Sequence, residues 1–581
     1  MSILNPKSPS EYLLDARSRE AVEKTVAFFE TKGKRRLRED DQNRVWYRDF
    51  LDFIKGESLF ADFLTPPSYG GPGSRWDTYR NCALNEVLGF YGLCYWYTWQ
   101  VSILGLGPIW MSPNEGLKRK AAEKLRAGGI FAFGLSEKEH GADIYSTAMR
   151  LHEDPASSAP GTPSGRARFL AKGSKYYIGN ANEAAMVSVF GKMKGAGAGG
   201  KDDYVFFVTD PGQPGYELVR SVTATQSYVA EFNLNDVPVD ESSILLRGRD
   251  AWDAALNTVN VGKYNLGWAS IGISAHAFHE ALNHAVARRL YGHSVSDFPH
   301  VRRMFLDAWA RLVAMKLFAL RAADYQRAAS RNDRRYLLYN PVMKMKVTTE
   351  GERVIDLLWD VIAAKGLERD VYFEMAVRDI RQLPKLEGTV HVNIALIVKF
   401  MGSYFFNATP FPEVGRRTEA EHDAYLFDQG STGGLSSVRF HDYRPAFARF
   451  AGVPNVGLFL EQVAVLEKLL LETKPTEEQE KDIDFLLALG EMFALVVHGQ
   501  LVLENAALLA VDTETVDQIF DFAVRDFSAF ALELHGKAAT TARQMELCLA
   551  AIRRPAVDPS RARSIWEQKV LPLYGSYRMN D

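Results

Sequence analysis

The spacing of apolar residues changes twice along the chain. Over residues 12–128, and again from residue 251 onward, apolar side chains recur every three to four positions, which predicts amphipathic helices. Between residues 131 and 245, short β-branched and aromatic runs alternate with polar positions, which is typical of strands. This order predicts an α+β fold, mainly α, in which a middle antiparallel β domain separates helical regions.

Turn-rich segments divide the helical regions further. Pro and Gly clusters interrupt the chain between residues 408 and 434, and Asn340-Pro341 predicts a pause in the helical pattern before it. Thr476 and Gln479 have the spacing of a capping box at the start of another apolar helix. We therefore expect an N-terminal helical domain at 1–128, a middle β domain at 129–248, a helical bundle domain at 249–408, a linker region at 409–450 and an extra C-terminal helical domain at 451–581.

One stretch imitates a membrane span, because residues 87–114 include no charged side chain. However, it has a Gly105/Gly107/Pro108 break and aromatic residues at its middle, whereas membrane spans place Trp and Tyr at their ends. We expect a buried helix pair here and no integral membrane span.

Composition excludes several classes of protein. Hydrophobic residues make up 47% and charged residues 24% of 581, which is ordinary for a globular chain and leaves no room for long disorder. The formal net charge of −3 gives no electrostatic footprint for binding nucleic acid. The three cysteines, Cys82, Cys94 and Cys548, form no C-x-x-C pair, and residues 1–8 lack the layout of a signal or transit peptide. We expect a cytoplasmic protein without a disulfide framework or a metal site.

A glycine-rich run at residues 195–200 satisfies the G-x-G-x-x-G pattern of dinucleotide-binding folds. That pattern needs a helix directly after it, whose N-terminus receives the pyrophosphate. Strand-like sequence precedes and follows this run, so we interpret it as a hairpin loop.

Four motifs occur in an order that points to a known family. Residues 131–143 include Phe133-Gly134-Leu135-Ser136 and end in Gly141-Ala142-Asp143, and Tyr177 follows in Lys175-Tyr-Tyr-Ile-Gly-Asn180. Then come Arg288-Arg-Leu-Tyr291-Gly292 and Glu387-Gly388-Thr389. Their order and spacing resemble those of acyl-CoA dehydrogenases over residues 12–405. The C-terminal block resembles, in size and position only, the extra domain of very-long-chain acyl-CoA dehydrogenases and acyl-CoA oxidases.

The resemblance implies a role for each motif. Glu387 stands where the family has its catalytic base, and its backbone N–H, with Gly388, would contact the thioester; Lys263 is a further substrate candidate. Without the resemblance, Glu-Gly-Thr would be a helix-entry turn with Thr389 as N-cap. The residues expected to contact FAD are Phe133, Leu135, Ser136, Gly141, Ala142, Tyr177, Ile178, Gly179, Arg288, Tyr291 and Thr389. Arg288 would reach the FAD pyrophosphate of a neighbouring subunit.

This sequence also departs from the family pattern. Lys138 replaces a proline, Ala142 a serine and Gly179 a threonine whose hydroxyl approaches the flavin; Pro299 replaces a glutamine, and residues 363–366 replace a Gly-Gly-x-Gly loop. Each change removes a flavin contact, so we expect FAD to be held differently or less tightly. The aromatic residues Tyr91, Tyr95, Trp96 and Trp99 lie where relatives line the acyl pocket, and their spacing does not tell whether they block the pocket or support it.

The resemblance implies an FAD-dependent acyl-CoA dehydrogenase that makes trans-2-enoyl-CoA, passes electrons to an electron-transfer flavoprotein and forms a homodimer. Two alternatives stay open on the same fold. One is an acyl-CoA oxidase or flavin monooxygenase that uses oxygen. The other is a flavin-free, non-catalytic relative that serves as an interaction scaffold.

Overall fold

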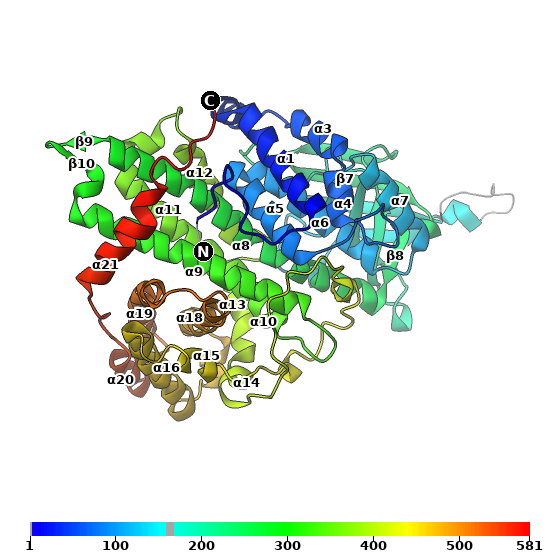
Figure 1. The fold of residues 1–581 in the computed structure, drawn as a ribbon. Coiled ribbons are helices and arrows are strands. Elements are labelled where there is room, and N and C mark those ends of the chain that lie inside the picture. The colour runs from blue at the N-terminus through cyan, green and yellow to red at the C-terminus, as the bar shows by residue number, and fades with distance from the viewer. Residues whose placement is uncertain (1–2, 159–167) are drawn as a thin grey trace.

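A computed structural model describes residues 3–158 and 168–581 (Figure 1). The chain begins with seven helices. These are α1 (Ala16–Lys32), α2 (Lys34–Gln42), α3 (Arg48–Gly56), α4 (Leu59–Leu64), α5 (Thr78–Tyr91), α6 (Leu93–Met111) and α7 (Glu115–Arg126). The charge-free stretch forms the end of α5, from Val87 to Tyr91, and all of α6; the two helices are separated at Gly92 and almost entirely buried. The predicted buried helix pair is confirmed.

The middle region forms one eight-stranded sheet. Its strands are β1 (Phe131–Gly134), β2 (Arg150–Glu153), β3 (Phe169–Gly179), β4 (Met186–Met193), β5 (Asp203–Thr209), β6 (Tyr216–Ser221), β7 (Val229–Val239) and β8 (Ile244–Arg247). The order is β6-β7-β3-β2-β4-β5-β8, with β1 also beside β4. The sheet is mostly antiparallel as predicted, but β1 and β2 run parallel to β4, because each reaches β4 through a long connection rather than a hairpin. The glycine-rich run lies in the β4–β5 hairpin, as predicted.

A helical bundle follows the sheet. Its helices are α8 (Gly248–Ala287), α9 (Pro299–Arg327), α10 (Tyr336–Val342), α11 (Thr348–Ile362), α12 (Tyr372–Ile380), α13 (Val390–Ile397) and α14 (Met401–Phe406). The 40-residue α8 packs against α5, α6, α9 and α11 and so joins both helical regions. Between α8 and α9 a short hairpin, β9 (Arg289–Leu290) and β10 (His293–Ser294), projects from the molecule (Figure 1).

The predicted pause at Asn340-Pro341 is wrong. The chain stays helical through Pro341, and residues Met343–Val347 form a π-helical segment before α11 begins. Proline lacks the N–H that would bond four residues back, and a widened turn is one way for a helix to absorb that loss. This segment later proves to be part of the candidate site.

The C-terminal helices form an added layer on the bundle (Figure 1). They are α15 (Arg444–Ala448), α16 (Pro454–Glu472), α17 (Glu477–Lys481), α18 (Ile483–Leu508), α19 (Thr513–His535) and α20 (Ala542–Ala550), after which α21 (Pro559–Ile565) runs back along the bundle. The capping box at Thr476 and Gln479 is present. Arg311 of α9 is buried between two acids, donating to Glu350 of α11 (2.5 Å) and to both oxygens of Asp526 in α19 (2.7 and 2.9 Å). Charge pairing therefore fixes this layer to the bundle.

The segment predicted as a linker is bound to the helices beneath it. Arg327 of α9 donates to the carbonyl oxygens of Arg417 (2.5 Å) and Glu419 (2.8 Å) and to the carboxylate of Asp423 (3.1 Å). Further along, the backbone N–H and hydroxyl of Thr432 both donate to Asp253 of α8 (3.0 and 2.6 Å). The segment thus covers the bundle rather than simply connecting two domains.

Two segments of the described residues are long and apolar enough to cross a membrane by length and composition alone. In Ile483–Leu508, which is α18, 83% of the most apolar window is buried inside the fold. In Tyr372–Phe406, 39% of the most apolar window is buried, and this segment includes the turns between α12 and α13. The expectation that the chain has no membrane span stays a prediction.

Candidate active site

Glu387 lies in a strained turn that precedes α13. Its backbone φ is +51° and that of Gly388 is +88°, a region that non-glycine residues rarely adopt. Lys344 of the π-helical segment holds this turn, because its ammonium donates to the carbonyl oxygens of Pro384 (2.7 Å) and Gly388. Thr389 is exposed and is the N-cap of α13, accepting from the N–H of Val392 at 3.4 Å. Strain of this kind, where the surroundings impose it, is typical of functional positions.

The two carboxylate oxygens of Glu387 have different surroundings. Oε1 accepts a hydrogen bond from Gln100 Nε2 of α6 at 2.6 Å. Oε2 is buried and has no hydrogen-bond partner among the described residues. It lies close to Gly262 of α8, where a β-carbon would come within 3.1 Å of it. Burial raises the pKa of Glu387 to about 7, against the lowering effects of Gln100, Lys344 and Lys263. This carboxyl can therefore take up and release a proton near neutral pH.

Two lysines face this carboxyl. Burial lowers the pKa of Lys263, on α8, to about 8, and the Glu387 charge partly offsets that effect. Burial and then Lys263 lower the pKa of Lys344 to about 7. In addition, no described residue accepts a hydrogen bond from the backbone N–H of Glu387. The structure therefore brings Lys263, Glu387 and Gly388 together, as the sequence predicted, and adds Lys344, which it missed.

The predicted flavin-binding segments lie beside each other within the sheet, where the chain leaves β1 next to the second half of β3. The N–H of Tyr176 donates to the Ser136 carbonyl at 3.1 Å, and Lys175 Nζ donates to the Leu135 carbonyl at 2.9 Å. Tyr177 is 59% exposed at φ +64°, where β3 bulges against β7. The buried side chains of Phe133 and Ile178 support these segments, while Gly141 and Ala142 are exposed. An exposed aromatic ring in a strained backbone conformation is a surface on which a flat ligand can stack.

Two predicted contacts differ in the structure. The Ser136 hydroxyl, expected as a donor to the flavin, donates to the Tyr176 carbonyl at 2.7 Å, because the two chain segments lie so close. Gly179 leaves a space that Tyr97 of α6 fills: a β-carbon there would lie 2.6 Å from Cε1 and 2.9 Å from Oη of Tyr97. Burial and the charge of Glu387 raise the pKa of Tyr97. Tyr97 thus packs against the end of β3 and lies within electrostatic range of Glu387.

The aromatic residues whose role the spacing left open support the site from behind. Tyr91, Tyr95, Trp96 and Trp99 are each fully buried. Tyr95, for example, packs against Phe29, Tyr47 and Phe50 of the N-terminal region. Of the α6 side chains, Gln100 bonds to Glu387, and Tyr97 lies within range of its charge. One signal in the sequence pointed to Gln100, because it is an amide within a long apolar run.

Arg288 and Tyr291 lie away from Glu387, on the projecting β9–β10 hairpin (Figure 1). Tyr291 is 93% exposed at φ +52°, and Arg288 forms no ion pair with any residue between 3 and 158 or 168 and 581. Within one chain these residues do not join the site. The expectation that Arg288 acts across a subunit interface stays a prediction.

A cavity of about 580 Å³ opens beside α8. Aromatic rings and one guanidinium line it, together with the covering segment around Thr432; the lining residues are Tyr145, Asp203, Tyr204, Arg249, Trp252, Leu256, Thr432 and Leu435. Leu256 and Lys263 are seven residues apart, two helical turns, so they share one face of α8 about 10 Å apart. The cavity therefore lies on the same helix face as the lysine next to Glu387.

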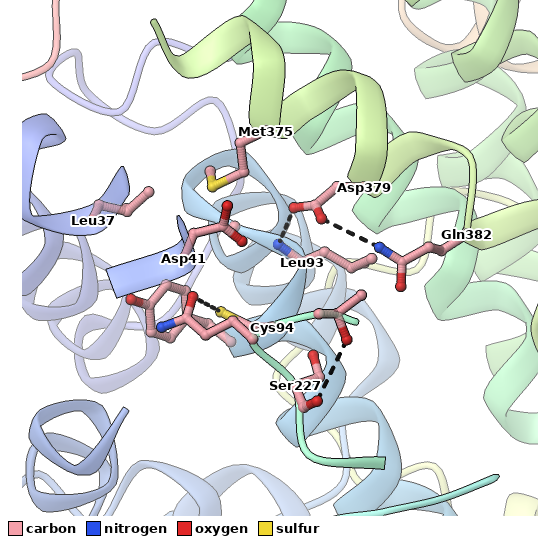
Figure 2. A pocket seen from close by; sticks show the side chains of 12 residues that line it. Leu37, Asp41, Leu93, Cys94, Ser227, Met375, Asp379 and Gln382 are labelled. Carbon is pink, nitrogen blue, oxygen red and sulfur yellow. Dashed lines mark hydrogen bonds between the residues drawn. The ribbon is translucent and has the colours of Figure 1, made fainter. Parts of the chain in front are cut away.

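A second cavity, of about 10 Å³, lies between α2, α6 and α12 and shares no residue with the Glu387 site (Figure 2). The N–H of Leu93 and the amide of Gln382 donate to the Asp379 carboxyl there (3.1 and 3.3 Å). Burial and the nearby Asp41 raise the pKa of Asp379. The volume suits about one water molecule.

Comparisons with known proteins agree with this geometry. Residues 250–402 match the family described as acyl-CoA dehydrogenase, C-terminal domain. An acyl-CoA dehydrogenase of Bacillus subtilis is 22% identical over 346 residues, which are 58% of this chain and 85% of that protein. The very long-chain specific acyl-CoA dehydrogenase of rat is 23% identical over 364 residues, 61% of this chain and 53% of that protein.

Solved structures share the fold. A Bacillus anthracis acyl-CoA dehydrogenase complexed with FAD superposes with a TM-score of 0.74 at 16% identity and covers 96% of both chains. A structure titled as the electron transferring flavoprotein of Acidaminococcus fermentans has a TM-score of 0.59 at 21% identity and covers 68% of this chain and 99% of that one. Residues 250–402 therefore match an acyl-CoA dehydrogenase C-terminal domain, and the related sequences and the shared fold extend the similarity to acyl-CoA dehydrogenases over most of the chain.

Proposed function

We propose that the protein is an FAD-dependent acyl-CoA dehydrogenase that converts an acyl-CoA thioester into trans-2-enoyl-CoA. The observation that carries this proposal is Glu387, a carboxyl whose pKa lies near 7, whose Oε2 is without a partner and whose backbone N–H is free. A base poised near neutral pH beside a free donor suits the removal of a weakly acidic proton next to a carbonyl. The names of the related proteins support the same chemistry.

The residues around Ser136 and Tyr177 fit a flavin ring in part. The exposed Tyr177 and the exposed backbone around Gly141 and Ala142 offer a stacking surface and close approach. Against this, the Ser136 hydroxyl already has an acceptor and Tyr97 occupies the space beside Gly179. When bound, FAD supplies the acceptor for the hydride that leaves the substrate. We propose that the chain binds FAD with fewer side-chain contacts than the family pattern provides, and that Arg288 and Tyr291 reach the FAD of a second subunit in a homodimer.

The cavity beside α8 suits the CoA portion of the substrate. Tyr145, Tyr204 and Trp252 can stack on a purine, and Arg249 can pair with phosphate. From there an extended thiol arm would follow α8 toward Lys263 and Glu387. The thioester oxygen would accept from the N–H of Glu387, and the Glu387 carboxylate would take the proton from the adjacent carbon.

We propose an electron-transfer flavoprotein as the final electron acceptor, as the resemblance to acyl-CoA dehydrogenases implies. The test is the visible spectrum of the purified protein, recorded without oxygen before and after adding acyl-CoAs of graded chain length. Loss of the flavin band with one length class is the expected result. A spectrum unchanged by every thioester would refute the proposal, peroxide release in air would favour the oxidase, and protein that cannot be reconstituted with FAD would favour the scaffold.

Two variants assign the base. Glu387→Gln should keep its flavin band and bind acyl-CoA, but no longer bleach. Glu153→Gln, which changes an exposed carboxylate on β2, is the control and should behave like the parent. Below pH 7 Glu387 is protonated and cannot accept a proton, so the bleaching rate of the parent should rise with pH with a midpoint near 7. Undiminished bleaching in Glu387→Gln would exclude this residue as the base.

A further inference from the structure

Behind Glu387, four buried side chains form an unbroken row of hydrogen bonds. The Trp96 indole N–H donates to Asn85 Oδ1 (2.7 Å), and Asn85 Nδ2 donates to Asn265 Oδ1 (2.9 Å). Asn265 Nδ2 then donates to Gln100 Oε1 (2.8 Å), and Gln100 Nε2 donates to Glu387 Oε1 (2.6 Å). The four residues that precede Glu387 are fully buried and come from α5, α6 and α8. We call this row the amide chain.

The direction of the amide chain is fixed by groups that cannot reverse their roles. The Trp96 indole nitrogen only donates, so the atom of Asn85 that faces it must be the carbonyl oxygen. The backbone carbonyl of Asn81 only accepts, and it takes a bond from Asn85 Nδ2 at 2.7 Å. At the other end, the carbonyl of Gly262 accepts from Gln100 Nε2 at 3.2 Å. Asn265 lies between these two ends, so its carbonyl oxygen must face Asn85 and its amide nitrogen must face Gln100. Gln100 therefore always presents N–H to Glu387.

A fixed donor on one oxygen makes the two oxygens of Glu387 unequal. Oε1 is occupied by Gln100, while Oε2 is buried without a partner. Protonation of Oε1 would weaken the bond from Gln100, which cannot turn to accept, because a hydroxyl oxygen is a poorer acceptor than a carbonyl or carboxylate oxygen. A proton arriving at Glu387 therefore belongs on Oε2.

We propose that the amide chain of Trp96, Asn85, Asn265 and Gln100 is a positioning device that orients Glu387 and assigns Oε2 as the oxygen that receives the substrate proton. This inference rests on the function proposed above. In that step the bond between the proton and the α carbon breaks and an O–H bond forms at Oε2. The electron pair of the broken bond stays on the substrate and forms the new double bond; FAD, when bound, would accept the hydride from the β carbon.

The charged and titratable groups that face Glu387 come from three elements. Lys263 lies on α8, Lys344 on the π-helical segment and Tyr97 on α6. Both lysines favour the carboxylate form, as does the N–H of Gln100. Removing the amide chain alone leaves the lysines in place, so its effect is separable from theirs.

The test is a titration of the Glu387 carboxyl by infrared difference spectroscopy, with Glu387→Gln as the blank. Gln100→Leu removes the donor at similar volume and should move the protonation midpoint up by about one pH unit. Asn265→Leu leaves Gln100 in place but removes the donor to its Oε1, so that Gly262 alone orients it; the midpoint should shift in the same direction by less. Asn505→Leu, which removes a buried amide that bonds Leu317 on the far side of α9, is the matched control and should leave the midpoint unchanged.

A midpoint in Gln100→Leu and Asn265→Leu equal to that of the parent would overturn the proposal, and so would an equal shift in Asn505→Leu. The carboxyl stretching frequency gives a second readout, since protonated Glu387 with a donor on its carbonyl oxygen should absorb at lower frequency in the parent than in Gln100→Leu. Neither readout needs FAD or thioester. If the flavin fails to bleach while the infrared shifts appear, the proposed function is refuted, but the role of the amide chain in orienting Glu387 is supported.

Discussion

Replacing Gly179 by alanine tests whether Tyr97 fills the space beside the strand. A β-carbon at residue 179 would lie 2.6 Å from Tyr97 Cε1 and 2.8 Å from Val101 Cγ2, both shorter than the usual contact of about 3.5–4.0 Å between carbon atoms. Both partners lie on α6, which is buried along nearly its whole length. Overpacking a site of this kind costs about 1–3 kcal/mol of the free energy of unfolding. Since α6 cannot move away freely, we expect a loss in this range.

A double-mutant cycle gives the sharper result. Tyr97→Ala removes one of the two obstructing side chains, so Gly179→Ala should cost at least about 1 kcal/mol less in that background than in the parent. The assay is urea unfolding of the four proteins, followed by tryptophan fluorescence. Equal costs in both backgrounds would refute the packing argument. The same cycle with Gly179→Thr, read by FAD retention on gel filtration, asks whether the hydroxyl of the family pattern fits once Tyr97 is gone.

Three further outcomes are expected. Lys344→Met removes a charge that favours the carboxylate form of Glu387, so the pH midpoint for flavin bleaching should move up by about one unit. An unchanged midpoint would show that Lys344 does not lower the pKa of Glu387. Asp379 keeps a proton in the folded state that the unfolded chain releases above pH ~4, so the free energy of unfolding should fall as pH rises from about 4 through the raised pKa of Asp379. Thermal unfolding scans of Asp379→Asn should show a smaller fall with pH. The same fall in the variant and the parent would contradict this reasoning. Arg327→Met leaves the Asp423 carboxylate buried and unpaired, at a cost of about 3–5 kcal/mol, and limited proteolysis should then cut the segment at 409–429 faster than in the parent.

The periodicity of apolar residues predicted most of the fold, because helices and strands bury one face at fixed spacing. It failed at Pro341, where packing on all sides keeps the chain helical despite the lost hydrogen bond. It also missed the parallel pairing of β1 and β2 with β4. Which strands become neighbours depends on long connections that local pattern does not encode.

The candidate site was predictable only where a motif marked it. Glu387 followed from its motif, but Gln100 lies 287 residues away in sequence, and only the packing of α6 against the turn brings them together. Lys344 could not be predicted for the same reason, since it lies far from Glu387 in sequence, just after Asn340-Pro341, where the sequence suggested a break in the helix. The substitution of Gly179 was visible in the sequence as a lost contact. That Tyr97 fills the gap required the fold.

The pairing of Arg311 with Asp526 makes the bundle depend on the C-terminal layer. With α19 removed, Arg311 would keep Glu350 and Asp307 as partners but would lose both hydrogen bonds to Asp526. The faces of α9 and α11 that α19 now covers would also meet water. The C-terminal layer is therefore an integral part of the fold rather than a detachable module, and a chain cut before α15 is expected to unfold at a lower temperature than the parent.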